Sequence, residues 1–260
     1  MFERKSLGAD ARVSKIQYSG TTLKVIAAVM TIIGTFGVAI LERVMDLDSY
    51  STATLIEGMA DLTGETMIMS TLILLCLGIQ SMALPIYAVL LIEGFKHSQD
   101  IGRYAVRIAV LAVVSEIPYD LAMRGQWIDW SEQNPVFGLL IALAVLYFIA
   151  YFDHMTKLKG ILLKGLIAIA GILWAMFLGT NWAAWILVLV TAVLWIAQGN
   201  GAFTTFTGVV ASLFQFPAPF GFVFTHFYNG EKGKMNRWVF YIVYPAQLLI
   251  LGVIGKYFMS

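Results

Sequence analysis

The chain has 260 residues, of which 59% are hydrophobic and 13% are charged, and its mean hydropathy is +0.79. Soluble domains average about 25% charged residues, so this composition excludes an ordinary soluble protein. A net charge of +1 provides no strong field to attract nucleic acid, and we predict no nucleic-acid partner. We predict an all-α fold, a polytopic transmembrane helical bundle in the lipid bilayer, formed as a single domain over residues 1–260.

Apolar stretches near bilayer length predict where the chain enters the membrane, because a spanning helix needs about 20 mostly apolar residues. Residues 1–21 are charged and polar, without an apolar core and cleavage site, so we expect no cleavable signal peptide. The predicted segments follow in the order 23–41, 67–94, 101–123, 135–152, 160–178, 182–197, 202–228 and 238–258.

Prolines interrupt two of these segments. Pro85 lies near the middle of 67–94 and predicts a kink, or a short helix leading into a longer one. The run Phe216-Pro217-Ala218-Pro219 breaks 202–228, which then forms two shorter crossings or a re-entrant hairpin. We therefore favour about nine membrane segments, with eight as the alternative.

The distribution of lysine and arginine predicts a cytoplasmic N-terminus, since cytoplasmic loops are enriched in these residues. The alternation holds through the first five segments. A single crossing by 202–228 would place the basic residues after it outside, which favours nine segments and an external C-terminus. The N-terminal basic residues are Arg4, Lys5, Arg12, Lys15 and Lys24, and the following external loop carries Asp46, Asp48, Glu57, Asp61 and Glu65.

Cysteine and histidine exclude two kinds of site. Cys76 is the single cysteine, so the chain has no intrachain disulfide and no thiolate metal centre. No two histidines stand at metal-ligand spacing, and we predict no metal.

Ionisable side chains inside apolar segments cost several kcal/mol unless they are paired or hydrated, so each is a candidate functional residue. Glu93 ends one segment and Arg107 begins the next, and a short loop makes these helices antiparallel neighbours. We predict a buried Glu93–Arg107 ion pair, which either belongs to a site or only joins two helices. The other candidates are Glu116, Asp120, Lys164 and His226.

A basic rim is predicted at the same cytoplasmic end, formed by Lys96, His97, Arg103 and Arg107 with Tyr104 beside them. Arg103 and Arg107 are one helical turn apart and share a face. Such a rim can hold the phosphates of a nucleotide-like donor. The alternatives are an ordinary positive-inside signal and, for His97, a solvated loop position.

Glu116 lies near the outer end of its segment, where Pro118 would bend the helix. An outward-facing polar pocket would explain it, but snorkelling toward the membrane surface is the simpler interpretation.

Three stretches carry a family resemblance: LPIYAVLLIEGFKHS at 84–98 followed by Tyr104 and Arg107, NPVFGLL at 134–140, and YNGEKG at 228–233 leading to FYIVYPAQLL at 240–249. Together they resemble the TraX family, integral membrane proteins named for conjugative pilin acetylation and related in outline to membrane acyltransferases. The match is weakest over 158–215. The resemblance implies a multi-pass protein of the bacterial cytoplasmic (inner) membrane.

The chain departs from the family pattern at four positions. Gly34 and Thr35 stand where the family usually has an Asp-His pair, Ser81 where it has an arginine, and Gln247 where a histidine follows Tyr-Pro. None of the four titrates near neutral pH, so none can act as a general base there.

The resemblance implies transfer of an acetyl group from acetyl-CoA, or of another acyl group from its CoA ester, to a protein or small-molecule acceptor. Glu93 and His97 are then the catalytic candidates, and the donor-binding candidates are Lys96, Arg103, Tyr104, Arg107 and Asn229. The partner would be a pilin-like or peptide acceptor, or another membrane protein. The alternatives are an inactive membrane scaffold, which the four substitutions favour, and a small ion-coupled transporter.

Overall fold

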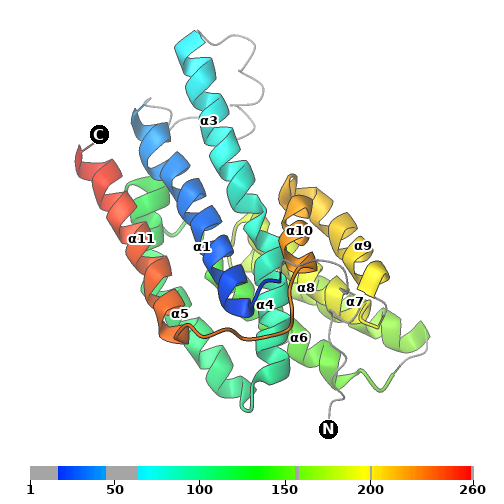
Figure 1. The fold of residues 1–260 in the computed structure, drawn as a ribbon. Coiled ribbons are helices and arrows are strands. Elements are labelled where there is room, and N and C mark those ends of the chain that lie inside the picture. The colour runs from blue at the N-terminus through cyan, green and yellow to red at the C-terminus, as the bar shows by residue number, and fades with distance from the viewer. Residues whose placement is uncertain (1–16, 45–63, 156–157, 200, 259–260) are drawn as a thin grey trace.

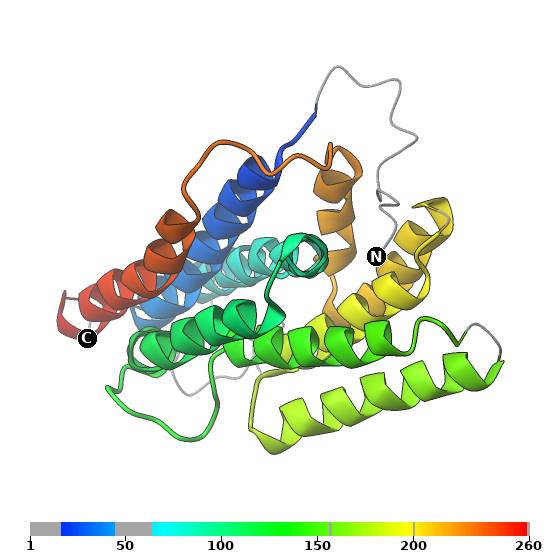
Figure 2. The ribbon, with the colours of Figure 1, turned by 90° about the horizontal axis from the view of Figure 1, so that it is seen from below.

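The computed structural model describes residues 17–44, 64–155, 158–199 and 201–258, and these ranges are helical with connecting turns (Figures 1 and 2). The all-α prediction is confirmed there. The predicted N-terminal basic residues from Arg4 to Lys15, and most of the predicted acidic loop, lie outside the described residues. The helices are α1 (Gly20–Phe36) with its π-helical extension η1 (Gly37–Glu42), α3 (Gly64–Ser81), α4 (Ala83–His97), α5 (Ile101–Arg124), α6 (Val136–Tyr151), α7 (Leu158–Phe177), α8 (Trp182–Ile196), α9 (Gly201–Ser212), the 3₁₀ turns η2 (Leu213–Gln215) and η3 (Ala218–Gly221), α10 (Phe222–His226) and α11 (Arg237–Phe258).

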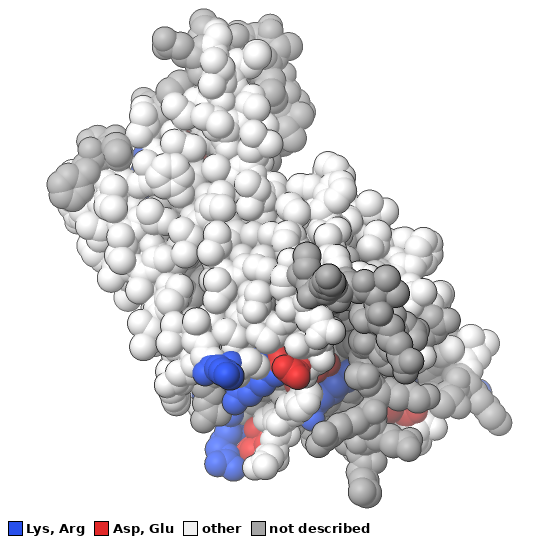
Figure 3. Space-filling view, in the orientation of Figure 1, with Lys and Arg blue, Asp and Glu red and all other residues white. Residues whose placement is uncertain are grey.

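Four helical stretches of the described chain are long and apolar enough to cross a membrane: Gly20–Glu42, Met67–His97, Leu158–Phe177 and Trp238–Tyr257. Two shorter apolar helices, Val136–Tyr151 and Trp182–Ile196, accompany them. On the face drawn in Figure 3, charged side chains gather at one end and the remaining visible surface is almost uncharged. A helical multi-pass membrane protein follows, while the count of nine segments and the cytoplasmic N-terminus stay predictions.

Helix α5 is absent from these four although it has 24 residues. It carries four of the ionisable side chains that the sequence singled out: Arg103, Arg107, Glu116 and Asp120. The helix is therefore long enough to cross, and its ionisable side chains set its composition apart from that of the four apolar stretches, as expected where charges serve a site or a structural cluster.

The break predicted near Pro85 separates α3 from α4 at Met82. Pro85 has no amide hydrogen to donate to the Ser81 carbonyl, and its ring would collide with that carbonyl in a continuous helix. At the same break, the Ser81 hydroxyl donates to the Gly78 carbonyl at 2.7 Å. The kink prediction is confirmed.

The proline-rich break in 202–228 produces a short helical hairpin. Helix α9 leads to the turn at Phe216 and Pro217, and η3 and α10 return beside it (Figure 1). Helix α9 has 12 residues and extends about 18 Å, and η3 and α10, with four and five residues, extend about 16 Å, so both arms are too short to cross a bilayer of about 30 Å. This geometry agrees with the re-entrant alternative.

Helices α5 and α11 run side by side in the same direction, with α1 against α11. Gly252 allows the close approach, because a Cβ atom there would lie 2.8 Å from the Ala122 backbone nitrogen. At the other end, Trp238 of α11 lies beside Arg107 of α5. This register brings the first turn of α11 onto the face of α5 that carries the arginines.

Candidate functional site

A pocket of about 590 Å³ lies at the end of the molecule where α4 leads into α5. Its walls come from the α4–α5 loop, the first two turns of α5 and the first turn of α11. The lining residues are His97, Ser98, Gln99, Asp100, Arg103, Val106, Arg107 and Trp238. Three of the predicted site residues, His97, Arg103 and Arg107, thus share one pocket.

Asp100 lines this pocket and caps the N-terminus of α5. Its Oδ1 accepts from the Arg103 backbone amide at 2.9 Å, and its Oδ2 accepts from Arg103 Nε at 2.6 Å. These hydrogen bonds, the backbone one foremost, keep the pKa of Asp100 below its usual value. The carboxylate therefore stays ionised and neutralises Arg103.

His97 stands on the pocket wall with one ring nitrogen engaged. Its Nδ1 lies 2.9 Å from the Glu93 carbonyl oxygen and 3.6 Å from the Glu93 carboxylate. A carbonyl oxygen only accepts, so the neutral ring carries its proton on Nδ1, and Nε2 has a free lone pair. The His97 side chain is 61% exposed, so Nε2 is open to accept a proton, and the Glu93 carboxylate lies on the Nδ1 side of the ring.

The predicted Glu93–Arg107 ion pair does not form. The Glu93 carboxylate pairs with Lys96 and His97 on its own helix, each at 3.6 Å. Arg107 donates from Nε to the Arg103 carbonyl at 3.0 Å, and within the described chain its terminal nitrogens have no hydrogen bond and no carboxylate partner. A basic residue four positions from Glu93 on the same helix reaches it more easily than one on the next helix, which explains the difference.

Lys96 turns away from the pocket toward α8. Its ammonium lies 5.7 Å from the Trp195 ring centroid, and the Trp195 indole donates to Asp153 at 3.0 Å. Asp153 also accepts from Lys164 at 2.7 Å, so the buried Lys164 is paired. Lys96 belongs to this helix-joining network rather than to the predicted rim around the pocket.

Tyr104 and Asn229 also lie away from the lining of the pocket. The Tyr104 ring packs against Gly94, where a Cβ atom would lie 2.6 Å from the Tyr104 hydroxyl. Asn229 joins the loop before α11 to the start of the described chain, because its backbone amide donates to the Tyr18 carbonyl at 3.0 Å. Its Oδ1 accepts from the Glu231 backbone amide at 2.9 Å. Both residues shape the surroundings of the pocket.

Tyr228, next to Asn229, is close enough to Glu93 to be affected by its charge. Burial and then the Glu93 carboxylate raise the pKa of Tyr228 to about 12, so its hydroxyl remains protonated. Glu93 thus faces the loop before α11 on one side and supports His97 on the other.

An apolar groove of about 250 Å³ continues from the pocket along α5 and α11. It shares Val106, Arg107 and Trp238 with the pocket, and the sequence interpretation missed it. The sequence feature that could have predicted this groove is the four-residue spacing of Val106, Val110 and Val114, which places them on one face of α5. The remaining lining residues are Leu111, Tyr241 and the shared Trp238.

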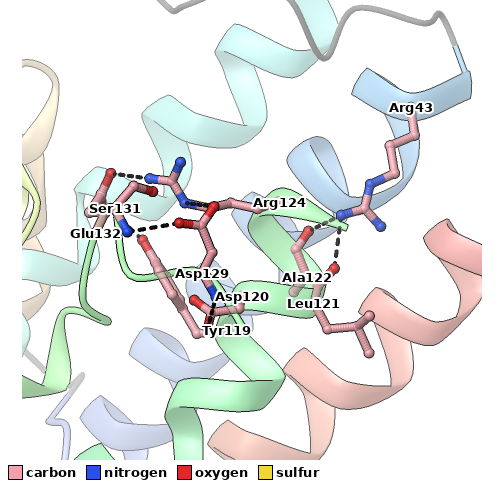
Figure 4. Close-up of polar contacts among 9 residues, drawn as sticks. All are labelled: Arg43, Tyr119, Asp120, Leu121, Ala122, Arg124, Asp129, Ser131 and Glu132. Carbon is pink, nitrogen blue, oxygen red and sulfur yellow. Dashed lines mark hydrogen bonds and ion pairs between the residues drawn. The ribbon is translucent and has the colours of Figure 1, made fainter. Parts of the chain in front are cut away.

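At the opposite end of α5, Arg124 centres a polar cluster (Figure 4). Arg124 lies 2.9 Å from Glu132 and 3.7 Å from Asp129. Asp120 is 1% exposed, and its Oδ2 accepts from the Asp129 backbone amide at 2.9 Å. One backbone amide therefore holds this buried carboxylate, while its Oδ1 has no hydrogen bond within the described chain.

Glu116 is tied to Asn134, whose backbone and side-chain amides both donate to Glu116 Oε2. This bonding joins α5 to the start of α6, so Glu116 does not snorkel as expected. The transporter hypothesis stays a prediction.

The four positions that depart from the family pattern are occupied by packing groups. A Cβ atom at Gly34 would overlap the Gln80 side chain, and the hydroxyls of Thr35 and Ser81 donate to carbonyls of their own helices. Gln247 is 9% exposed, and its amide has no hydrogen bond within the described ranges. Three of the four thus have a structural role.

Comparison with known proteins identifies one family: the model of the TraX protein family matches residues 19–255. Searches of curated proteins and of solved structures gave no match. Within the described part of the chain, no three His, Cys, Asp or Glu side chains are grouped to hold a metal ion.

Proposed function

Because the chain belongs to the TraX protein family, we propose that it is a membrane acyltransferase that takes an acyl group, acetyl in the simplest case, from a CoA thioester. The acceptor would be an amine or hydroxyl of a protein or small molecule. The observation that supports this most is the presence of His97, Arg103 and Arg107 in one pocket. A base and two phosphate-binding side chains are what such a transfer requires.

The pocket suits a phosphate-bearing donor by its charge. Two arginines line it against one aspartate, and Asp100 is already paired with Arg103. Arg107 therefore supplies an uncompensated positive charge, and guanidinium groups bind phosphate through parallel N–H···O bonds. Bound acyl-CoA would supply the activated acyl carbonyl carbon.

His97 would act as the general base. Nε2 accepts the proton of the acceptor as the acceptor attacks the acyl carbonyl carbon, and it returns the proton to the departing sulfur. Meanwhile the Glu93 carboxylate, 3.6 Å from Nδ1, stabilises the positively charged imidazolium. Each proton taken up by His97 is released within one turnover.

The experiment is a calorimetric titration of the purified protein with acetyl-CoA. We expect Arg107→Gln to weaken binding about tenfold, which corresponds to about 1.4 kcal/mol for one lost charge-assisted contact. Arg124→Gln, at the far end of the same helix, is the matched control and should bind normally. A wild-type protein that binds no acetyl-CoA at millimolar concentration would refute the proposal.

A second measurement separates catalysis from binding. His97→Asn should bind acetyl-CoA as the wild type does but transfer its labelled acetyl group, to water or an amine, about 10²–10⁴ times more slowly. Equal rates in both proteins would exclude His97 as the base.

An inactive membrane scaffold is the second candidate, supported by the packing roles of Gly34, Thr35 and Ser81. Gly34 makes room for Gln80 of the neighbouring helix, the two hydroxyls bond within their own helices, and none of the three offers a titratable group. Purification from native membranes tests this: a scaffold should bring a stoichiometric protein partner, and isolation of the chain alone under mild conditions would count against it.

A further inference from the structure

We propose that the groove between α5 and α11 binds an anionic phospholipid from the membrane leaflet on the side of the pocket. Its phosphate would contact Arg107, and one acyl chain would follow the valine stripe Val106, Val110 and Val114. This proposal does not require acyl transfer, because it concerns the membrane-facing flank of the pocket and a ligand already present in the bilayer.

Charge is the first argument. Arg103 is neutralised by Asp100 at 2.6 Å, and Glu93 is engaged by Lys96 and His97. Arg107 has no carboxylate partner within the described chain. It stands about 9 Å along α5 from Ile101, where the pocket with charged and polar walls meets the apolar groove. A lipid phosphate at this place would neutralise its charge.

Shape is the second argument. Arg107 borders both cavities: the wider one has charged and polar walls, and the narrower one is lined by apolar and aromatic side chains. From Val106 to Val114 the stripe extends about 12 Å along the helix. The combined cavity is amphipathic in the same order as a phospholipid, with the headgroup end at the arginine and the apolar end deeper along the helices.

The groove also opens toward the membrane. Val106, Val110 and Val114 are each more than half exposed, on a helix of a multi-pass membrane protein. A free phosphate would leave this apolar surface uncovered, whereas an acyl chain covers it. Basic pockets between membrane helices are a known setting for anionic headgroups. These features favour a lipid over a soluble anion.

Native mass spectrometry of the detergent-purified protein tests the proposal, using phosphatidylglycerol and phosphatidylcholine with identical acyl chains and no CoA compound. We expect phosphatidylglycerol to bind about tenfold more tightly, as one charge-assisted contact provides. Arg107→Gln should abolish the preference, and Arg107→Lys should retain part of it. Equal binding of the two lipids, or an unchanged preference in Arg107→Gln, would overturn the proposal.

Two further arms test the place and the source of the ligand. Val110→Trp fills the groove and should reduce phosphatidylglycerol binding about tenfold, while Val113→Trp, on the same helix outside the groove, should not. If both variants bind normally, the chain does not lie along the stripe and the proposal fails. Glycerol 3-phosphate should not bind at a thousandfold higher concentration; if it competes fully, the site is one for soluble phosphate. Failure of acetyl-CoA titration would leave these results unaffected.

Discussion

Helix α5 carries an arginine near each end, and the two have opposite surroundings. Arg124 lies among carboxylates, at 2.9 Å from Glu132 and 3.7 Å from Asp129 (Figure 4). Arg107 borders a pocket and a groove without any carboxylate partner in the described chain. The same residue type on one helix is thus structural at one end and available to a ligand at the other. Neighbouring side chains, rather than residue identity, decide which role it has.

The contrast extends to two asparagines, Asn134 and Asn229, whose Oδ1 atoms each accept from the backbone amide two residues later. Substituting them should give the largest difference in stability. Asn134 is fully buried and donates to the Ala112 carbonyl at 2.8 Å and to Glu116, whereas Asn229 is partly exposed. Asn134→Ala removes the side-chain donor to the Ala112 carbonyl and to the Glu116 carboxylate, which keeps only the backbone amide of residue 134, and should lower the free energy of unfolding by about 2–4 kcal/mol. Asn229→Ala should cost about 1 kcal/mol or less. Equal losses in thermal denaturation would contradict the contrast.

Exchanging each arginine tests the comparison directly. Arg124→Gln removes the cation shared by Asp129 and Glu132, and these partly exposed pairs should cost about 1–2 kcal/mol of stability. Arg107→Gln should change the stability of the lipid-free protein by no more than about 0.5 kcal/mol. Denaturation of both variants in the same detergent measures the difference. A larger loss in Arg107→Gln would show that Arg107 is structural.

Two tyrosines of α5 sharpen the comparison further. The Tyr119 hydroxyl donates to Glu132 at 3.2 Å, while Tyr104 acts mainly by packing on Gly94. Tyr119→Phe should cost about 1 kcal/mol, and Tyr104→Phe less than about 0.5 kcal/mol. The two midpoints of thermal unfolding should differ in that direction, and the reverse order would be inconsistent with the hydrogen bonds described.

The smallest effect concerns pH at the pocket. The pKa of Asp100 is lower in the folded protein than in the unfolded chain, so its contribution to stability is fully present above the unfolded value. That contribution is lost as the pH falls through the lowered folded value. Stability profiles of wild type and Asp100→Asn should therefore differ at neutral pH and converge in strong acid. Parallel profiles throughout would exclude this linkage.

Sequence alone determined the membrane class, the all-helical fold, the kink before Pro85 and the break at Pro217. Each follows from local chemistry: apolar length, or a proline that cannot continue a helix. It also placed His97, Arg103 and Arg107 near one another, because the loop between α4 and α5 is short.

Tertiary structure decided which of those side chains pair and which remain open. Lys96 reaches Trp195, Glu93 supports His97, and Arg107 meets Trp238 because α11 packs beside α5 in one register. Residues 96 and 195 are remote in sequence, so no local spacing encodes their contact. The groove likewise exists only once the two helices lie side by side, since its walls come from both.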